Sequence, residues 1–172
     1  MIPDFEANGQ LPVGYIRPTL SIFKQRFVID CPGSVTRENI FNGYIKFCSK
    51  LLSLNAAEIQ WVNGSFTTDK ENPNDIDFVT HIDVKKLNPC DEVKETLSKL
   101  NDRERVKKEC KCDAYFIPLY PPEMPERHAD TVKSIKYWSK WFARDRENNP
   151  KGLIEFDLTD ESFDIGNCNG GV

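Results

Sequence analysis

Two strand-like stretches separated by a polar linker constrain the fold of this chain more than any other feature. The first, residues 59–62, is rich in β-forming residues and runs directly into a turn that contains Gly64. The second, residues 75–79, alternates acidic with apolar residues. Because successive side chains of a strand point to opposite faces, Asp75 and Asp77 share one face and the apolar residues between them enter the core. The pattern predicts two neighbouring strands with a turn and two carboxylates at one opening.

Helical and strand-like segments fill the rest of the chain. Helical spacing of apolar residues and short β-rich runs predict helices over 19–27, 36–54, 89–108 and 130–144 and strands over 113–119 and 153–158. Closely spaced glycines and prolines predict an extended arm over residues 1–18, and residues 159–172 are predicted to form a flexible tail. A chain of 172 residues, 39% hydrophobic, suffices for one core. We expect a single α+β domain over residues 1–172, with a mixed central β-sheet and flanking helices.

The charge and the apolar content narrow the possible partners. A formal charge of −4 argues against non-specific DNA binding, which relies on a surplus of Lys and Arg, although a local basic face stays possible. No run of about 18 apolar residues is present, so we expect no membrane partner. Six scattered cysteines in a chain of this size indicate reduced thiols. These features predict a soluble protein in the cytoplasm.

The turn and the two carboxylates suit phosphate chemistry. Two carboxylates separated by one residue on a strand match the oxygen ligands that Mg²⁺ or Mn²⁺ prefers. Gly64 would let a phosphate approach the backbone, and Ser65 adds a hydroxyl at the same opening. The arrangement predicts a phosphoryl-transfer site for a nucleoside triphosphate, although the same residues could form a hairpin turn with solvated aspartates.

The stretch from Gly64 to Asp77 resembles the signature of the DNA polymerase beta-like nucleotidyltransferase superfamily, a Gly-Ser turn followed by Asp-x-Asp. The resemblance implies a polymerase beta palm-like fold and a third carboxylate on a later strand. Asp113 is the candidate for it, and Glu109 a weaker substitute. The catalytic residues and metal ligands implied are therefore Asp75, Asp77 and Asp113. The wider chain is similar to a group of small, stand-alone bacterial or phage members of poorly defined function.

Five residues are candidates for nucleotide binding: Gly64, Ser65, Lys70, Tyr115 and Lys136. Lys136 is chosen because the superfamily often places a basic residue of a later helix near the phosphates, and Tyr115 because it shares a strand face with Asp113. Each has a plain alternative, since a lysine in a turn or on a helix face is commonly solvated and an aromatic residue is commonly core.

The resemblance implies an enzyme that moves a nucleoside monophosphate from an NTP, such as ATP, to a hydroxyl of a protein, RNA or small molecule. Two features depart from the pattern: Phe66-Thr67-Thr68 follows the Gly-Ser pair where relatives carry a basic or small residue, and no appended acceptor domain is visible. An alternative is therefore a non-catalytic, regulatory protein of a toxin–antitoxin or antiviral defence system, with a toxin or defence component as its partner. Phosphohydrolase or nuclease chemistry at the same metals is a third, weaker hypothesis.

Overall fold

Helices and strands alternate along residues 1–88 and 90–166, which are the residues that the computed structural model describes. In chain order the elements are β1 (Tyr15–Ile16), α1 (Leu20–Lys24), a π-helical turn η1 (Gln25–Ile29), α2 (Arg37–Leu52), β2 (Ala57–Asn63), a 3₁₀ turn η2 (Ser65–Thr67), β3 (Ile76–Asp83), α3 (Asp91–Asn101), α4 (Arg103–Cys110), β4 (Cys112–Leu119), α5 (Pro125–Phe142) and β5 (Leu153–Asp157). No helix within these residues is long and apolar enough to cross a membrane.

The strands form one mixed sheet in the order β1-β5-β2-β3-β4. Strand β2 is antiparallel to both β3 and β5, whereas β4 runs parallel to β3 and β1 parallel to β5. The chain can reverse directly between β2 and β3, but the parallel step from β3 to β4 needs a crossover, which α3 and α4 supply. The predicted α+β class, with a mixed central sheet and flanking helices, is confirmed.

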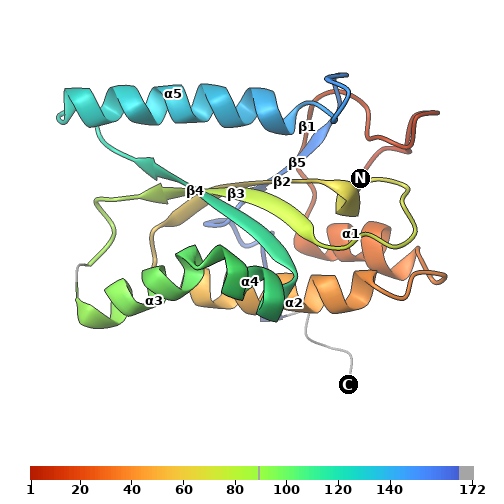
Figure 1. Ribbon diagram of the computed structural model, residues 1–172, viewed down its shortest axis with the longest axis horizontal. Helices are drawn as coiled ribbons and strands as arrows, with labels where there is room; N and C mark the ends of the chain where they lie inside the picture. Colours follow the sequence, from red (N-terminus) through yellow and green to blue (C-terminus); the bar gives the residue numbers. More distant parts are fainter. Residues whose placement is uncertain (89, 167–172) are drawn as a thin grey trace.

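Helices cover the two faces of the sheet unequally. Figure 1 shows α5 alone on one face and α1, α2, α3 and α4 on the other. The larger core lies between the sheet and α2, where aromatic rings pack edge to face. The strand residues that point into it include Ile76 and Phe78, both fully buried, as the alternation of residues 75–79 predicted. The opposite face of the sheet packs a smaller core against α5.

Two helices differ from their predicted bounds. The helix predicted over residues 89–108 is two helices, because Asp102 leaves the helical conformation with ψ 88° and its side chain accepts a hydrogen bond from the Arg105 backbone N–H at 3.0 Å. Asp102 thus caps a new helix, and the break aims α4 back at the sheet. The helix predicted from Asp130 begins earlier, at Pro125, since proline is well suited to the first helical turn.

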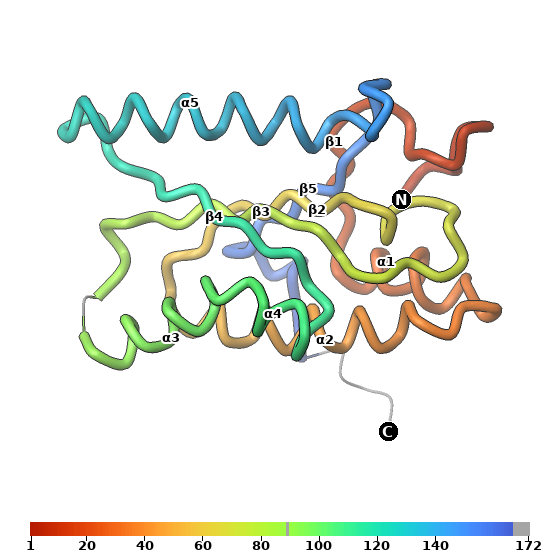
Figure 2. The backbone as a smooth tube through the Cα atoms, viewed as in Figure 1, coloured from red at the N-terminus to blue at the C-terminus, as the bar shows by residue number. Residues whose placement is uncertain are grey.

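Both ends of the described chain pack onto the body of the protein. Figure 2 shows the N-terminal arm beside the segment that precedes β5, and backbone N–H groups of Gly152 and Leu153 donate to the carbonyls of Leu11 and Gly14 at 2.9 and 3.0 Å. In the segment predicted to be a flexible tail, Phe163 is 5% exposed and joins the larger core. Residues 159–166 are therefore part of the packed structure, while residues 167–172 lie outside the described residues.

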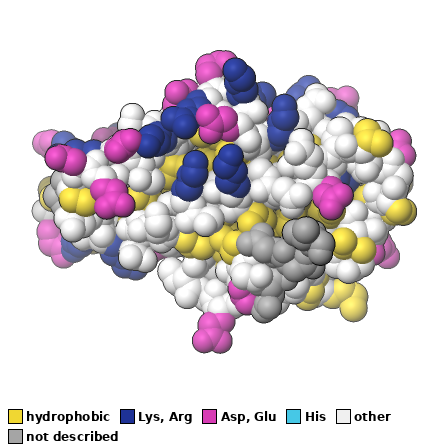
Figure 3. Space-filling view, turned by 90° about the horizontal axis from the view of Figure 1, so that it is seen from below, with side chains coloured by type: hydrophobic (Ala, Val, Ile, Leu, Met, Phe, Trp, Pro, Cys, Tyr) yellow, Lys and Arg dark blue, Asp and Glu magenta, His cyan; other side chains and the backbone are white. Residues whose placement is uncertain are grey.

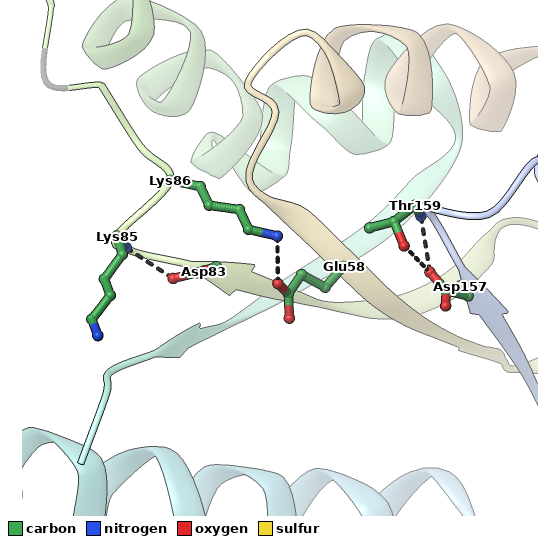
Figure 4. Close-up of polar contacts among 6 residues, drawn as sticks. All are labelled: Glu58, Asp83, Lys85, Lys86, Asp157 and Thr159. Atoms are coloured by element: carbon green, nitrogen blue, oxygen red, sulfur yellow. Dashed lines mark hydrogen bonds and ion pairs between the residues drawn. The ribbon is translucent and has the colours of Figure 1, made fainter.

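Acidic side chains at one end of the sheet stabilise its turns (Figure 4). Asp83 accepts a hydrogen bond from the Lys85 N–H at 2.9 Å, and Glu58 forms an ion pair with Lys86 at 2.8 Å. Asp157 accepts from both the backbone and the hydroxyl of Thr159. Since each carboxylate already has a partner in its own or a neighbouring turn, this end of the sheet has a structural role.

Candidate functional site

Three carboxylates meet at the opposite end of the sheet, where β2 ends and β3 and β4 begin. The register pairs Asn63 with Asp77 across β2 and β3, and Asp77 with Asp113 across β3 and β4. Residues paired in this way project from the same face of a sheet. Asp75 immediately precedes β3 and is close enough to affect the charge of Asp77. The structure therefore brings together Asp75, Asp77 and Asp113.

Gly64 lies directly beneath the carboxylate of Asp77. Its backbone has φ 82° and ψ −166°, a region that is essentially restricted to glycine, and a Cβ atom there would overlap an oxygen of Asp77. Ser65 follows as the first residue of η2, and its carbonyl accepts a hydrogen bond from the Thr68 hydroxyl at 2.8 Å. The Gly-Ser turn and the carboxylates thus form one contiguous site.

Phe66 and Arg37 hold the Gly-Ser turn in place from below. Phe66 is fully buried against Phe23 and Phe27, which explains the hydrophobic residue after the Gly-Ser pair. The Arg37 guanidinium, only 1% exposed, stacks on the Phe66 ring and donates at 2.6 to 3.0 Å to four backbone carbonyls, those of Phe27, Phe66, Thr68 and Lys70. The sequence did not reveal this role, because an arginine in a helical pattern is ordinarily solvated.

The carboxylates have an unfavourable environment when all are charged. Burial, followed by the negative charges of Asp75 and Asp113, raises the pKa of Asp77 to about 6. Lys151 and Lys107 act in the opposite direction but only partly offset the increase. Lys151 is itself 9% exposed, and burial lowers its pKa even though the Asp77 charge raises it. A site of this kind attracts additional positive charge.

Two basic side chains of α4 lie against the outer two carboxylates. Lys107 Nζ is 2.9 Å from Asp75 Oδ2, and Arg103 Nη2 is 2.8 Å from Asp113 Oδ1. Both ion pairs raise the pKa of the basic partner, and both basic side chains are more than half exposed. These two residues were missed in the sequence. Their spacing of four residues, which puts them on one helix face, was the available signal.

The remaining sequence candidates occupy different places. Tyr115 lies at the site, because its hydroxyl donates to Asp113 at 3.2 Å and accepts from Arg103 at 2.7 Å.

The side chains of Lys70 and Lys136 are exposed, and within the described residues no contact joins either to the three carboxylates. Glu109, the substitute third carboxylate, is instead paired with Arg105 on α4 at 2.9 Å. Among these basic residues, Arg103 and Lys107 contact the carboxylates, whereas Lys70 and Lys136 do not.

The oxygen ligands suit a hard divalent cation, but they are not preassembled around one. In residues 1–88 and 90–166 no three His, Cys, Asp or Glu side chains converge closely enough to hold a metal ion. Asp75 and Asp113 are instead paired with Lys107 and Arg103. The carboxylate oxygens of Asp75, Asp77 and Asp113 have the chemistry of cation ligands, but binding of a cation would require the two ion pairs to open.

Replacing Gly64 with alanine is expected to lower the free energy of unfolding by about 3 kcal/mol, because it combines backbone strain with overlap of the Asp77 carboxylate. Gly14→Ala is the matched control: Gly14 also has a positive φ, of 140°, but a Cβ atom there meets no neighbour within 4 Å. Urea denaturation of both variants separates strain from overlap. Equal losses in the two variants would contradict the packing of Asp77 over Gly64.

Comparison with known proteins places most of the chain in one family. A family described as of unknown function, DUF6932, matches residues 3–157, a range that contains all three carboxylates, the Gly-Ser turn and the basic residues around them. Neither the curated proteins nor the solved structures that were searched give a match. The chain therefore belongs to DUF6932, a family of unknown function.

Proposed function

We propose that this protein is a metal-dependent nucleotidyltransferase with a polymerase beta palm-like fold, which moves a nucleoside monophosphate from an NTP to an acceptor hydroxyl. One observation carries the proposal: Asp77 and Asp113 lie side by side on adjacent strands, with Asp75 immediately before β3 and the Gly64-Ser65 turn beside them. Sequence resemblance to the nucleotidyltransferase signature, with its Gly-Ser turn and Asp-x-Asp, supports the same reading. We place the protein in the cytoplasm, where Mg²⁺ and NTPs are available.

The three carboxylates would hold Mg²⁺ or Mn²⁺. When bound there, such an ion supplies positive charge that stabilises the phosphate oxygens during transfer. Gly64 leaves room for the Asp77 carboxylate beside the backbone, and the adjacent Ser65 adds a hydroxyl that would donate to a phosphate. Lys151 is buried near Asp77, where burial lowers its pKa and the Asp77 charge raises it.

Arg103 and Lys107 gain a role once the carboxylates turn toward a cation. Their present partners, Asp113 and Asp75, are less than one-fifth exposed, whereas the two basic side chains are more than half exposed. Released from the ion pairs, the guanidinium and the ammonium are free to bind the β- and γ-phosphates from one face of α4. The pairs thus keep two phosphate-binding groups at the mouth of the site before a nucleotide arrives.

The proposed reaction is a substitution at the α-phosphorus. An oxygen of the acceptor hydroxyl forms a bond to that atom, and the bond from the α-phosphorus to the oxygen bridging to the β-phosphate breaks. Diphosphate leaves with the electron pair of the broken bond, and the hydroxyl proton passes to water. The Tyr115 ring packs against the Arg103 guanidinium and Trp138, and its hydroxyl contacts both Asp113 and Arg103 at the edge of the site.

Incubating the protein with NTPs labelled at the α-phosphate, Mg²⁺ or Mn²⁺ and cell lysate tests the proposal. We expect label to transfer to an acceptor and diphosphate to be released, whereas the Asp77→Asn variant should leave the label on the NTP. Calorimetry with a non-hydrolysable NTP measures binding separately. Absence of both transfer and nucleotide binding would refute the proposed function, and free inorganic phosphate without transfer would favour a phosphohydrolase.

A regulatory, non-catalytic protein is a second candidate, favoured by the ion pairs that already neutralise Asp75 and Asp113. Such a protein would bind a nucleotide without turnover and act on a partner, such as a toxin or defence component. Asp75→Ala and Asp77→Ala separate the two candidates. If both variants lose the biological effect of the protein while still binding the partner, the enzyme is supported. If the effect persists, regulation without catalysis is supported.

A further inference from the structure

The outer side of α5 exposes a pair of aromatic rings to solvent. Figure 1 shows that α5 covers its face of the sheet alone, with no element outside it. Tyr137 is 57% exposed and Trp141 63% exposed, and their ring centroids are 6.1 Å apart at an interplanar angle of 18°. Large aromatic side chains are costly to expose, and these two, nearly parallel and one helical turn apart, form an exposed aromatic platform.

The aromatic platform of Tyr137 and Trp141 is bordered by positive charge. Residues 131–144 contain four Lys or Arg residues and no Asp or Glu, although the whole chain has a formal charge of −4. Lys136 and Lys140 have no carboxylate within ion-pair distance among the described residues, and Lys133 faces only the exposed Asp130, at 3.6 Å. Helical spacing puts these three lysines in one stripe next to Tyr137. The surface therefore suits an anionic ligand with flat, apolar groups.

Edge-to-face and tilted ring contacts connect this platform to the carboxylate site. The Tyr137 ring is 5.3 Å from Trp138, and Trp138 is 4.5 Å from Tyr115, centroid to centroid. The Tyr115 hydroxyl in turn donates to Asp113 at 3.2 Å. A continuous line of aromatic side chains thus runs from the exterior of α5, through the partly buried Trp138 and Tyr115, to the carboxylates.

We propose that this face of α5 binds single-stranded RNA, with bases stacked on Tyr137 and Trp141 and phosphates contacting Lys133, Lys136 and Lys140. A double-stranded nucleic acid keeps its bases stacked on one another, whereas a single strand offers both free bases and a charged backbone. RNA is the nucleic acid that ordinarily occurs single-stranded. RNA binding at this surface does not depend on the proposed function. The further step, in which the bound RNA provides the acceptor hydroxyl, rests on the proposed function.

The opposite face of the protein provides a matched control. Figure 3 shows that the side formed by α2, α3 and α4 also carries Lys and Arg, mixed with hydrophobic and acidic side chains. No exposed aromatic side chain of the described residues lies on these three helices. Replacing the exposed Lys46 and Lys50 of α2 with serine removes positive charge from a surface that lacks an aromatic platform.

Fluorescence anisotropy with a labelled single-stranded RNA of about twelve nucleotides, of mixed sequence, tests the proposal. The full chain should bind with a log Kd that changes by about 2 per tenfold change in salt, as three phosphate contacts to a single strand imply. Replacing Lys133, Lys136 and Lys140 with serine should weaken binding at least tenfold at low salt and flatten this dependence. Replacing Tyr137 and Trp141 with serine should weaken binding by about tenfold or more without changing the salt dependence.

Several outcomes would overturn the proposal. The first two are absence of RNA binding by the folded wild-type chain and an equal loss of RNA affinity in the Lys46 and Lys50 control. The others are tighter binding of the matched RNA duplex or of single-stranded DNA, and self-association through α5 that the aromatic variant abolishes. Thermal unfolding confirms that each variant is folded, which the exposure of the changed side chains leads us to expect. The Asp77→Asn variant should bind RNA as the wild type does, so failure of catalysis and failure of RNA binding are told apart.

Discussion

Arg37→Met is expected to lower the free energy of unfolding by about 4 kcal/mol. The substitution leaves four carbonyl groups that accept from the guanidinium without their donor, at about 1 kcal/mol each. A domain of this kind is stable by only about 5 to 15 kcal/mol, so the variant would be marginally folded. Lysine is no substitute, because one ammonium group cannot reproduce the planar fork that contacts carbonyls on two sides.

Arg105→Met on α4 is the control for this experiment. Arg105 is paired only with Glu109 on the helix surface, so the same chemical change there should alter stability by less than about 0.5 kcal/mol. Urea denaturation followed by circular dichroism gives both values. A similar, small loss at Arg37 would mean that the loop of the Gly-Ser turn does not depend on the guanidinium.

Asp77→Asn is expected to stabilise the metal-free protein at neutral pH while it abolishes nucleotide transfer. Raising the pKa of a carboxyl from 3.8 to about 6 means that the charged form costs the folded state about 3 kcal/mol. Asparagine removes this cost, but Lys151 and Lys107 then lose a nearby negative charge. We therefore expect the free energy of unfolding to rise by about 2 kcal/mol in the variant. Transfer should fall at least about 100-fold, because a ligand of the cation is lost.

The difference in the free energy of unfolding between Asp77→Asn and the wild type should increase as the pH rises. Below about pH 4 the carboxyl is protonated in both folded and unfolded chains, and it contributes no difference. Between about pH 4 and 6 the folded chain keeps the proton that the unfolded chain loses, so wild-type stability falls relative to the variant as the pH rises. Above about pH 6 the full difference applies.

Urea denaturation in the presence of a chelator, at pH 4.5 and pH 8, measures this dependence. Asp4→Asn, which removes a fully exposed carboxylate, serves as the control. A variant that is less stable than the wild type at pH 8 would contradict the unfavourable environment inferred for Asp77. Stabilisation with loss of activity is the combination expected of a functional carboxylate.

The sequence predicted those parts of the fold and site that depend on local pattern. Alternation placed Ile76 in the core and Asp77 on the other face, and the helical spacing of apolar residues located α2 and most of α5. These features depend on strand and helix periodicity, which neighbouring residues alone determine. The Gly-Ser turn was also visible, because glycine next to a strand marks a position where a side chain has no room.

Contacts between distant segments could not be predicted in the same way. Lys151 lies near Asp77, and Phe163 fills part of the core, only because β5 pairs with β2. Nothing in the composition of residues 159–166 distinguishes them from a solvated tail. Likewise, the low helix propensity of Asn101 and Asp102 did not by itself locate the break in the predicted helix, which lets α4 bury Val106.

The two edges of the sheet also affect how this protein can meet other molecules. One edge is β1, which has only two residues, and the other is β4, where Pro118 lacks a backbone N–H. A strand of another molecule could therefore pair with only two residues at the β1 edge, and at the β4 edge it would meet a row of backbone N–H donors interrupted by Pro118. Both features disfavour aggregation by strand addition. Partners are accordingly expected to approach through helices and loops, and α5 is the helix that stands free to receive them.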